Sequence, residues 1–136
     1  MTPPWRLLAA VAAGGAAGAL LRYLLGEQAP DDGGFPWTTF GINVSGAFLL
    51  ALLPAVSAVR RRQVLAVALG PGVLGGFTTL STYAEQGRAL LADGDVPLAL
   101  GYLGGTLAAC LVAVAVADHW STVAARREFH DEGGDE

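Results

Sequence analysis

Uncharged polar side chains that can bind an ion without trapping it lie within otherwise apolar stretches of this sequence. Asn43 lies in the segment TTFGINVSGAFLLALL, and hydroxyl residues crowd the segment LGPGVLGGFTTLSTY at residues 69–83. An amide offers two donors and an acceptor, and a hydroxyl offers one donor, so both can replace water around an anion. Together they predict a passive route for a small anion or a neutral solute.

Asn43 is the most informative single position. Its amide lies about two turns into an apolar run, where a polar group is costly and marks either a packing hydrogen bond or a transport pathway. We interpret its donors as contacts for an anion. An interhelical hydrogen bond without a role in transport is the alternative interpretation.

The segment at residues 69–83 predicts a helix that is broken at the middle of the membrane. Pro71 lacks a backbone donor and four glycines loosen the helix, and the hydroxyl residues lie consecutively around Leu80: Thr78, Thr79, Ser81 and Thr82. Unwound backbone at that depth is tolerated only where protein or a cavity surrounds it. Freed carbonyls can bind a cation, and half-helix N-termini favour an anion. A simple Gly/Pro kink with back-bonded threonines is the alternative.

A third group of weakly polar side chains lies in the last apolar run. Tyr102, Thr106 and Cys110 recur at every fourth position and therefore share one helix face. They predict the wall of a narrow hydrogen-bonding track, with ordinary packing as the alternative. Arg22, near the end of the first apolar run, either draws anions into a vestibule or extends to the lipid headgroups.

The elements that position these residues follow from the distribution of charge. Charged residues make up 15% of the 136 residues, against about 25% in soluble domains. Four stretches carry no charge at all: 7–21, 33–59, 63–84 and 96–117. Each is close to or beyond the length of about 20 residues that spans a bilayer as a helix. The pattern excludes a soluble domain, a disordered chain and a disulfide scaffold, since Cys110 is the only cysteine.

We therefore predict an all-α polytopic membrane protein, with residues 1–136 forming a single four-helix domain. The expected spans run over about 6–25, 37–59, 64–91 and 98–117, and a polar acidic tail follows at 121–136. Six arginines fall on the side that holds both termini and two on the other side, which predicts cytoplasmic termini. Close helix contacts are expected at three Gly-xxx-Gly pairs: 14 with 18, 72 with 76, and 101 with 105.

Residue types that are absent from the spans exclude further classes of function. No acidic residue lies in the middle of any span, which argues against a proton-coupled carrier and against a small multidrug exporter. The two histidines, His119 and His130, lie beyond the fourth span, so an intramembrane His-based protease would lack its base. We expect no enzyme activity.

Three segments together resemble the CrcB/Fluc family of fluoride channels. They are GGAAGALLRYLL at 14–25, TTFGINVSGAFLL at 38–50 and GGFTTLSTYAEQ at 75–86, and the resemblance extends over essentially all four spans. The resemblance implies a fluoride-selective channel in the cell membrane, through which fluoride leaves the cytoplasm down its gradient. It also implies an antiparallel dimer whose two pores run along the subunit interface.

The resemblance also implies roles for individual residues. The carbonyls of Gly75 and Thr78 would bind a structural Na⁺ at the dimer centre, and Arg22 would lie in the vestibule. The implied fluoride path comprises one residue of the second span and two short groups: Asn43; Leu80, Ser81, Thr82 and Tyr83; and Tyr102, Thr106 and Cys110.

Two departures from the family pattern suggest a second possibility. Leu80 and Tyr83 stand where family members typically carry phenylalanines, whose positive ring edges help to line the fluoride path. The biased arginine count also favours insertion in one direction, whereas an antiparallel homodimer needs both. The alternative function is therefore a non-conducting or half-active subunit, paired with an oppositely oriented homologous subunit.

Overall fold

The computed structural model of the chain describes the backbone of residues 3–131 and the side chains of residues 3–122. All regular elements in this part of the chain are helical. Four helical segments are long and apolar enough to cross a membrane: Pro4–Gln28, Trp37–Ala55, Gln63–Ala92 and Val96–Thr122. The fold is therefore that of an all-α, multi-pass membrane protein.

The first, second and fourth segments are built on long helices. Helix α1 spans Pro4–Gln28, and Pro4 begins it at a position where its missing N–H costs nothing. Helix α2 spans Trp37–Leu52 and passes into a short 3₁₀ turn, η1, over Leu53–Ala55. Helix α7 spans Val96–Asp131 and packs along α2.

The third segment is a chain of shorter pieces. After α3 (Ser57–Arg61) comes α4 (Gln63–Val67), then a π-helical stretch η2 (Ala68–Leu74), α5 (Gly75–Phe77) and α6 (Leu80–Ala92). Pro71 lies inside η2, where a wider turn accommodates a residue that cannot donate a backbone hydrogen bond. Thr78 and Thr79 between α5 and α6 have extended backbone, so the helix is interrupted there.

Helix α1 approaches η2 and α5 closely because glycines face one another. A Cβ added at Gly14 would lie 3.1 Å from the Cα of Gly72, and one added at Gly76 would lie 3.0 Å from the Cα of Gly15. Gly18 is in similarly close contact with Val73. The first two glycine pairs thus mark helix contacts, whereas a Cβ at Gly101 or Gly105 would meet nothing within 4 Å among the described residues.

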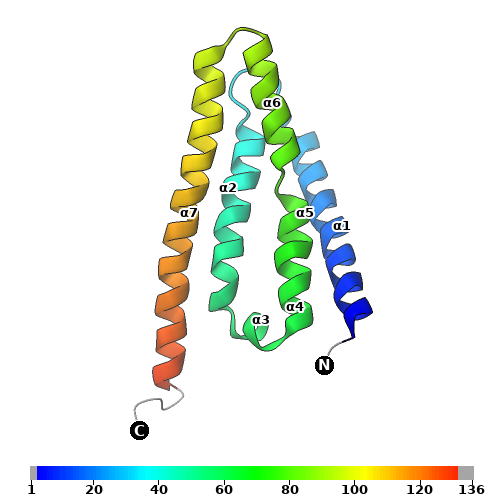
Figure 1. The fold of residues 1–136 in the computed structure, drawn as a ribbon, viewed down its shortest axis with the longest axis vertical. Coiled ribbons are helices and arrows are strands. Elements are labelled where there is room, and N and C mark those ends of the chain that lie inside the picture. Colours follow the sequence, from blue (N-terminus) through cyan, green and yellow to red (C-terminus); the bar gives the residue numbers. More distant parts are fainter. Residues whose placement is uncertain (1–2, 132–136) are drawn as a thin grey trace.

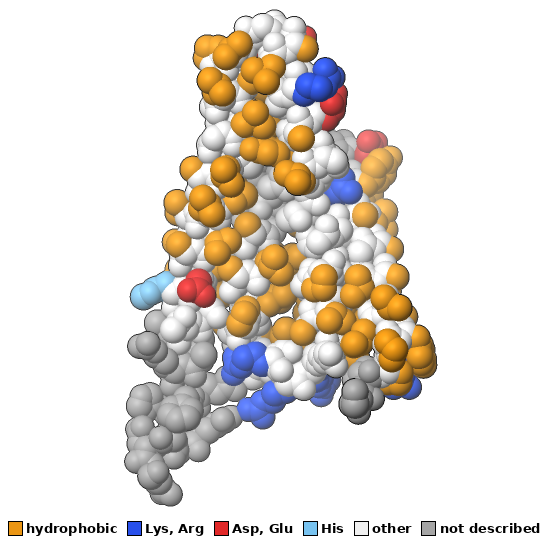
Figure 2. All heavy atoms as spheres, in the orientation of Figure 1, with side chains coloured by type: hydrophobic (Ala, Val, Ile, Leu, Met, Phe, Trp, Pro, Cys, Tyr) orange, Lys and Arg blue, Asp and Glu red, His pale blue; other side chains and the backbone are white. Residues whose placement is uncertain are grey.

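The four segments form an open, slightly splayed arrangement with α1 at one edge and α7 at the other (Figure 1). The N-terminus and the C-terminal end of α7 lie at the same end, together with the α2–α4 connection. Figure 2 shows hydrophobic side chains over the helices and arginine side chains gathered near that end. Arg126, Arg127 and most of the tail expected at 121–136 lie outside the side chains that the structure describes.

Candidate functional site

The interruption of the third segment is held by Asn43. The Asn43 amide donates from Nδ2 to the carbonyl of Thr79 at 3.0 Å, and its Oδ1 accepts the N–H of Thr79 at 2.8 Å. This paired contact imitates the pairing of two extended strands and satisfies backbone that a continuous helix would have satisfied itself. Asn43 therefore makes an interhelical hydrogen bond, which was one of the two interpretations offered by the sequence. A primary amide has two N–H groups, so the second N–H of Asn43 remains available.

Hydrogen bonds around the break leave two carbonyls without their usual helical donors. The N–H of Thr79, which a continuous helix directs to the Gly75 carbonyl, goes to Asn43 instead. The N–H of Thr82, which belongs to the Thr78 carbonyl by the same rule, donates to Thr79 Oγ1 at 3.1 Å. The intervening Gly76 carbonyl accepts the Nε–H of Arg22 at 3.2 Å. Gly75 itself is exposed within the chain.

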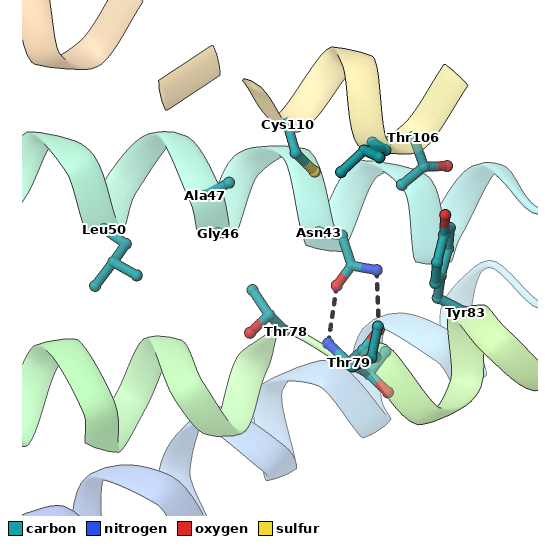
Figure 3. A pocket seen from close by; sticks show the side chains of 11 residues that line it. Asn43, Gly46, Ala47, Leu50, Thr78, Thr79, Tyr83, Thr106 and Cys110 are labelled. Atoms are coloured by element: carbon teal, nitrogen blue, oxygen red, sulfur yellow. Dashed lines mark hydrogen bonds between the residues drawn. The ribbon is translucent and has the colours of Figure 1, made fainter. Parts of the chain in front are cut away.

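A groove of about 320 Å³ runs beside the break, between α2, α6 and α7 (Figure 3). Seven of the residues singled out from the sequence line it: Asn43, Thr78, Thr79, Leu80, Tyr83, Thr106 and Cys110. The Thr106 hydroxyl is buried, with 3% of the residue exposed, and makes no hydrogen bond to any described residue of the chain. A buried hydroxyl without a partner is costly, so a ligand or water is expected to complete its bonding.

The side chains of residues 80–83, which follow the interruption of the third segment, point in different directions. Leu80 is 78% exposed and stands out from the rim of the groove. Tyr83 turns its hydroxyl to the carbonyl of Leu103 at 2.7 Å and so joins α6 to α7. Ser81 is exposed, and its hydroxyl lies 3.3 Å from that of Thr79. Thr82 turns away from the groove, into a second and more polar cleft.

The second cleft has a volume of about 470 Å³ and lies between α1, the start of α2 and α6. Arg22 and Thr82 line it, together with residues that the sequence analysis did not select, namely Asp31, Thr39 and Gln86. Arg22 is therefore directed at the break and into this cleft. From the sequence, only helical spacing could have indicated Thr39 and Gln86. Thr39 lies four residues before Asn43, and Gln86 lies four residues after Thr82.

A chain of hydrogen bonds connects this cleft with Tyr102. Gln86 donates from Nε2 to Asp31 Oδ2 at 3.1 Å, and the Tyr102 hydroxyl donates to Gln86 Oε1 at 2.8 Å. Tyr102 is fully buried, and its ring packs against Tyr83 and Phe35. Of the three residues expected to share one track on the last helix, Thr106 and Cys110 line the groove and Tyr102 lies behind it.

Asp31 also caps α2. Its carboxylate accepts the backbone N–H groups of Thr38 and Thr39 and the Thr39 hydroxyl, at 2.8, 3.1 and 2.9 Å. Partial burial by itself raises the pKa of Asp31, but hydrogen bonds from Thr38, Thr39 and Gln86 outweigh this and hold the pKa below its ordinary value. Asp31 is therefore a charged acceptor at neutral pH.

The donors at the site suit a small anion, and the freed carbonyls suit a hard cation. The described residues contain no group of three or more His, Cys, Asp or Glu side chains that could hold a metal ion. Carbonyl oxygens are the remaining cation ligands at the break. Four apolar helices, an interrupted third segment and a donor-lined groove define a multi-pass membrane protein of the transport class, in which irregular backbone lines a cavity.

Comparison with known proteins identifies the family. The profile described as "CrcB-like protein, Camphor Resistance (CrcB)" matches residues 9–117. "Fluoride-specific ion channel FluC 2" of Nocardia farcinica is 45% identical over 127 residues, which cover 89% of this chain and 91% of that protein. "Fluoride-specific ion channel FluC 1" of Streptomyces coelicolor is 45% identical over 117 residues, with coverage of 81% and 76%. The chain belongs to the CrcB-like family, as the sequence segments indicated.

Proposed function

We propose that the protein is a fluoride-selective ion channel that lets fluoride leave the cytoplasm passively. The similarity to proteins named fluoride-specific ion channels, over nine tenths of the length of one of them, carries this proposal. The family is one of ion channels and not of enzymes. The four apolar segments make it a multi-pass membrane protein, and the proposed function assigns it to the cell membrane.

The fluoride path follows the groove. Fluoride is small and strongly hydrated, so a selective route must offer close donors in place of water. The groove offers the second N–H of Asn43 and the thiol of Cys110, and the buried hydroxyl of Thr106 lies behind its wall without a partner among the described residues. These groups carry no charge, so they can release the ion as readily as they bind it.

Other residues of the path act at its ends and on its wall. The ring of Tyr83 lines the groove, and Leu80 supplies an apolar rim in place of a ring edge. Ser81 and Thr82 lie in the first turn of α6 and add one hydroxyl each, on different faces of that helix. The buried Tyr102 backs the wall, and Arg22 attracts anions into the polar cleft, which serves as the vestibule.

An antiparallel dimer completes the path. The groove is open along one side within a single chain, and its rim residue Leu80 is 78% exposed. A second subunit placed on this face would close the groove and exclude lipid from the donors. The same arrangement brings the third segments of the two subunits together at the dimer centre, near the middle of the membrane.

A structural Na⁺ fits the break. The carbonyls of Gly75 and Thr78 are those whose helical donors have been diverted, and unpaired carbonyls within a membrane are costly. Four such oxygens, two from each subunit, suit a hard monovalent cation. When bound, the ion would neutralise the partial charges of these carbonyls. Asn43 and Arg22 hold the neighbouring backbone in place on either side.

We further propose that both termini are cytoplasmic. The described structure places the N-terminus and the end of α7 together with the α2–α4 connection (Figure 1), which contains Arg60, Arg61 and Arg62. Positive residues favour the cytoplasmic side, so this end is assigned to the cytoplasm.

A second candidate function is that of one half of a heterodimeric channel. The arginine bias favours a single direction of insertion, and Leu80 cannot offer the positive ring edge that an aromatic side chain would offer. In this case the partner is a homologous subunit of opposite orientation, which completes the pore. The two candidates differ in whether the chain conducts alone.

Growth in fluoride tests the proposed function in cells. Bacteria that lack their own fluoride exporter should grow at a fluoride concentration that arrests vector-only cells when they express this chain. Growth that needs co-expression of a homologous subunit with the opposite arginine bias would identify the heterodimer. Arrested growth both with the chain alone and with the homologous subunit would contradict both candidate functions.

A further inference from the structure

The loop between α1 and α2 contacts the helices around the groove through two residues, Asp31 and Phe35. Asp31 bonds to the start of α2 and to Gln86 of α6. Phe35 packs edge-on against Tyr102 of α7, with the ring centres 5.4 Å apart. One loop therefore contacts the three helices that surround the groove. Asp31 is the only member of the chain from Asp31 through Gln86 to the Tyr102 hydroxyl that is ionised at neutral pH.

The chemistry of Asp31 determines the direction of every hydrogen bond in this chain. A carboxylate only accepts, so the Gln86 amide must turn its NH₂ group toward Asp31. The Gln86 oxygen then faces Tyr102, whose hydroxyl must donate to it. If residue 31 could both donate and accept, the Gln86 amide could reverse and the Tyr102 hydroxyl would lose its fixed direction.

We propose that Asp31 is a positioning residue that orients Gln86 and Tyr102 at the end of the fluoride path. The proposal rests on the proposed channel function, because the direction of the buried Tyr102 hydroxyl matters only if fluoride passes along the wall that Tyr102 backs. Asp31 does not bind the ion; it acts through Gln86. What fixes the direction at Tyr102 is that one member of the Asp31–Gln86 pair is a carboxylate, because a carboxylate at position 86 would also accept from the Tyr102 hydroxyl.

Exchange of the two side chains tests this proposal. Fluoride efflux from proteoliposomes is measured for Asp31→Asn, Gln86→Glu and the double variant Asp31→Asn/Gln86→Glu. In the double variant the amide at position 31 can donate to the carboxylate at position 86, which can still accept from Tyr102, so the hydrogen-bond directions at Tyr102 are kept. Asp32→Asn removes the same charge from the exposed neighbouring residue and serves as the control.

We expect Asp31→Asn to lower efflux about tenfold, the effect of losing a hydrogen bond to a charged group. Gln86→Glu places two carboxylates in contact, so its efflux should be low at neutral pH and recover as the pH falls and they share a proton. The other ionisable groups near Asp31 are the adjacent Asp32, Arg22, Tyr23 and Glu27 of α1, and Tyr102 of α7. In the efflux series only Asp32 is changed, in the control. Both variants with Asn at position 31 weaken the cap of α2, so efflux is compared at a temperature at which both remain folded. Under that condition the double variant should return to within about twofold of the wild type.

A second readout does not depend on conduction. The ¹³C resonance of the Tyr102 ring carbon that bears the hydroxyl, assigned with Tyr102→Phe, should shift in Asp31→Asn and return in the double variant. Wild-type protein that fails to release fluoride would refute the channel function, and the resonance would still decide the role of Asp31. Three results would overturn the proposal: an unmoved resonance, an unchanged efflux in Asp31→Asn, or a double variant that is not restored.

Discussion

At the scale of single residues, Asn43 combines two tasks that the sequence analysis treated as alternatives. Its amide oxygen and one N–H pair with the backbone of Thr79, and this contact stabilises the interruption of the third segment. The second N–H belongs to a side chain that lines the groove. A single asparagine can thus hold the break open and present a donor to an ion, because a primary amide has two donors.

Asn43→Asp tests both tasks at once. The new carboxylate cannot donate to the Thr79 carbonyl, and its charge would repel an anion in the groove. We expect fluoride efflux from proteoliposomes to fall at least about tenfold, which corresponds to about 1.4 kcal/mol. Ser45→Ala is the matched control on the same helix, because the Ser45 hydroxyl bonds to the carbonyl of Gly41 in its own helix. Wild-type efflux in Asn43→Asp would remove Asn43 from the path.

The residues of the site were only partly predictable from sequence. Asn43, Tyr83, Thr106 and Cys110 stand out because a polar side chain within an apolar run is unusual, and the structure gathers them at one groove. Asp31 gave no such signal, since an acidic residue in a polar loop is ordinary. Its importance depends on the contacts that the loop makes with α2 and α6, which no local pattern encodes.

At the scale of elements, close packing between α1 and η2 supports the broken third segment. Backbone approaches backbone there because glycines take the place of larger residues, as at many helix contacts in membranes. Gly14 and Gly18 are the buried residues of α1. The contact compensates for the irregular turn at Pro71 by packing it against a regular helix.

Adjacent glycines of α1 provide a matched test of this packing. A Cβ at Gly14 would overlap the carbonyl oxygen of Ala68 and lie 3.0 Å from the Val73 nitrogen, both of them backbone atoms that cannot move aside. Gly14→Ala should lower the free energy of unfolding by about 1–3 kcal/mol in detergent. At Gly15 the nearest atom would be 3.9 Å away, so Gly15→Ala should be neutral or slightly stabilising. Equal stability of the two variants would contradict the packing described.

The cap of α2 makes stability depend on pH. Hydrogen bonds hold the pKa of Asp31 below its ordinary value of 3.8, so the carboxylate stabilises the folded state above that pH. This contribution is lost as the pH falls below about 4 and through the folded-state pKa. We expect the thermal stability of the wild type to approach that of Asp31→Asn in acid and to exceed it at pH 7. A constant difference between the two proteins across this range would exclude Asp31 as the titrating group.

The elements themselves followed largely from the spacing of charge. Uncharged runs long enough to cross a bilayer predict helices, because only helices and closed barrels satisfy their backbone in lipid. The π-helical stretch and the extended backbone of Thr78 and Thr79 are finer features. Glycine and proline predicted irregularity in this segment, but the form it takes depends on what α1 and Asn43 offer from outside.

At the scale of the whole molecule, a single chain is an incomplete enclosure. Its groove opens along one side, and Leu80 and the exposed Gly75 lie where nothing in the described chain covers them. A second subunit would supply the missing wall and the other half of a cation site. The proposed assembly thus accounts for the exposed leucine and the freed carbonyls together.

Removal of Na⁺ should weaken this assembly. If the carbonyls of Gly75 and Thr78 bind the ion, then the purified protein should unfold at a higher temperature in sodium chloride than in choline chloride of the same ionic strength. The same comparison made with the monomeric and dimeric fractions should confine the effect to the dimer. Identical unfolding temperatures in the two salts would argue against a structural Na⁺.

The most direct test of the central claim compares fluoride with chloride. Liposomes that contain the purified chain are loaded with both ions, and the release of each is followed with an ion-selective electrode when a potassium ionophore balances the charge. The proposed function predicts rapid release of fluoride while chloride is retained, and no release of either ion from liposomes without protein. Release of both ions at the same rate, or retention of fluoride, would contradict it.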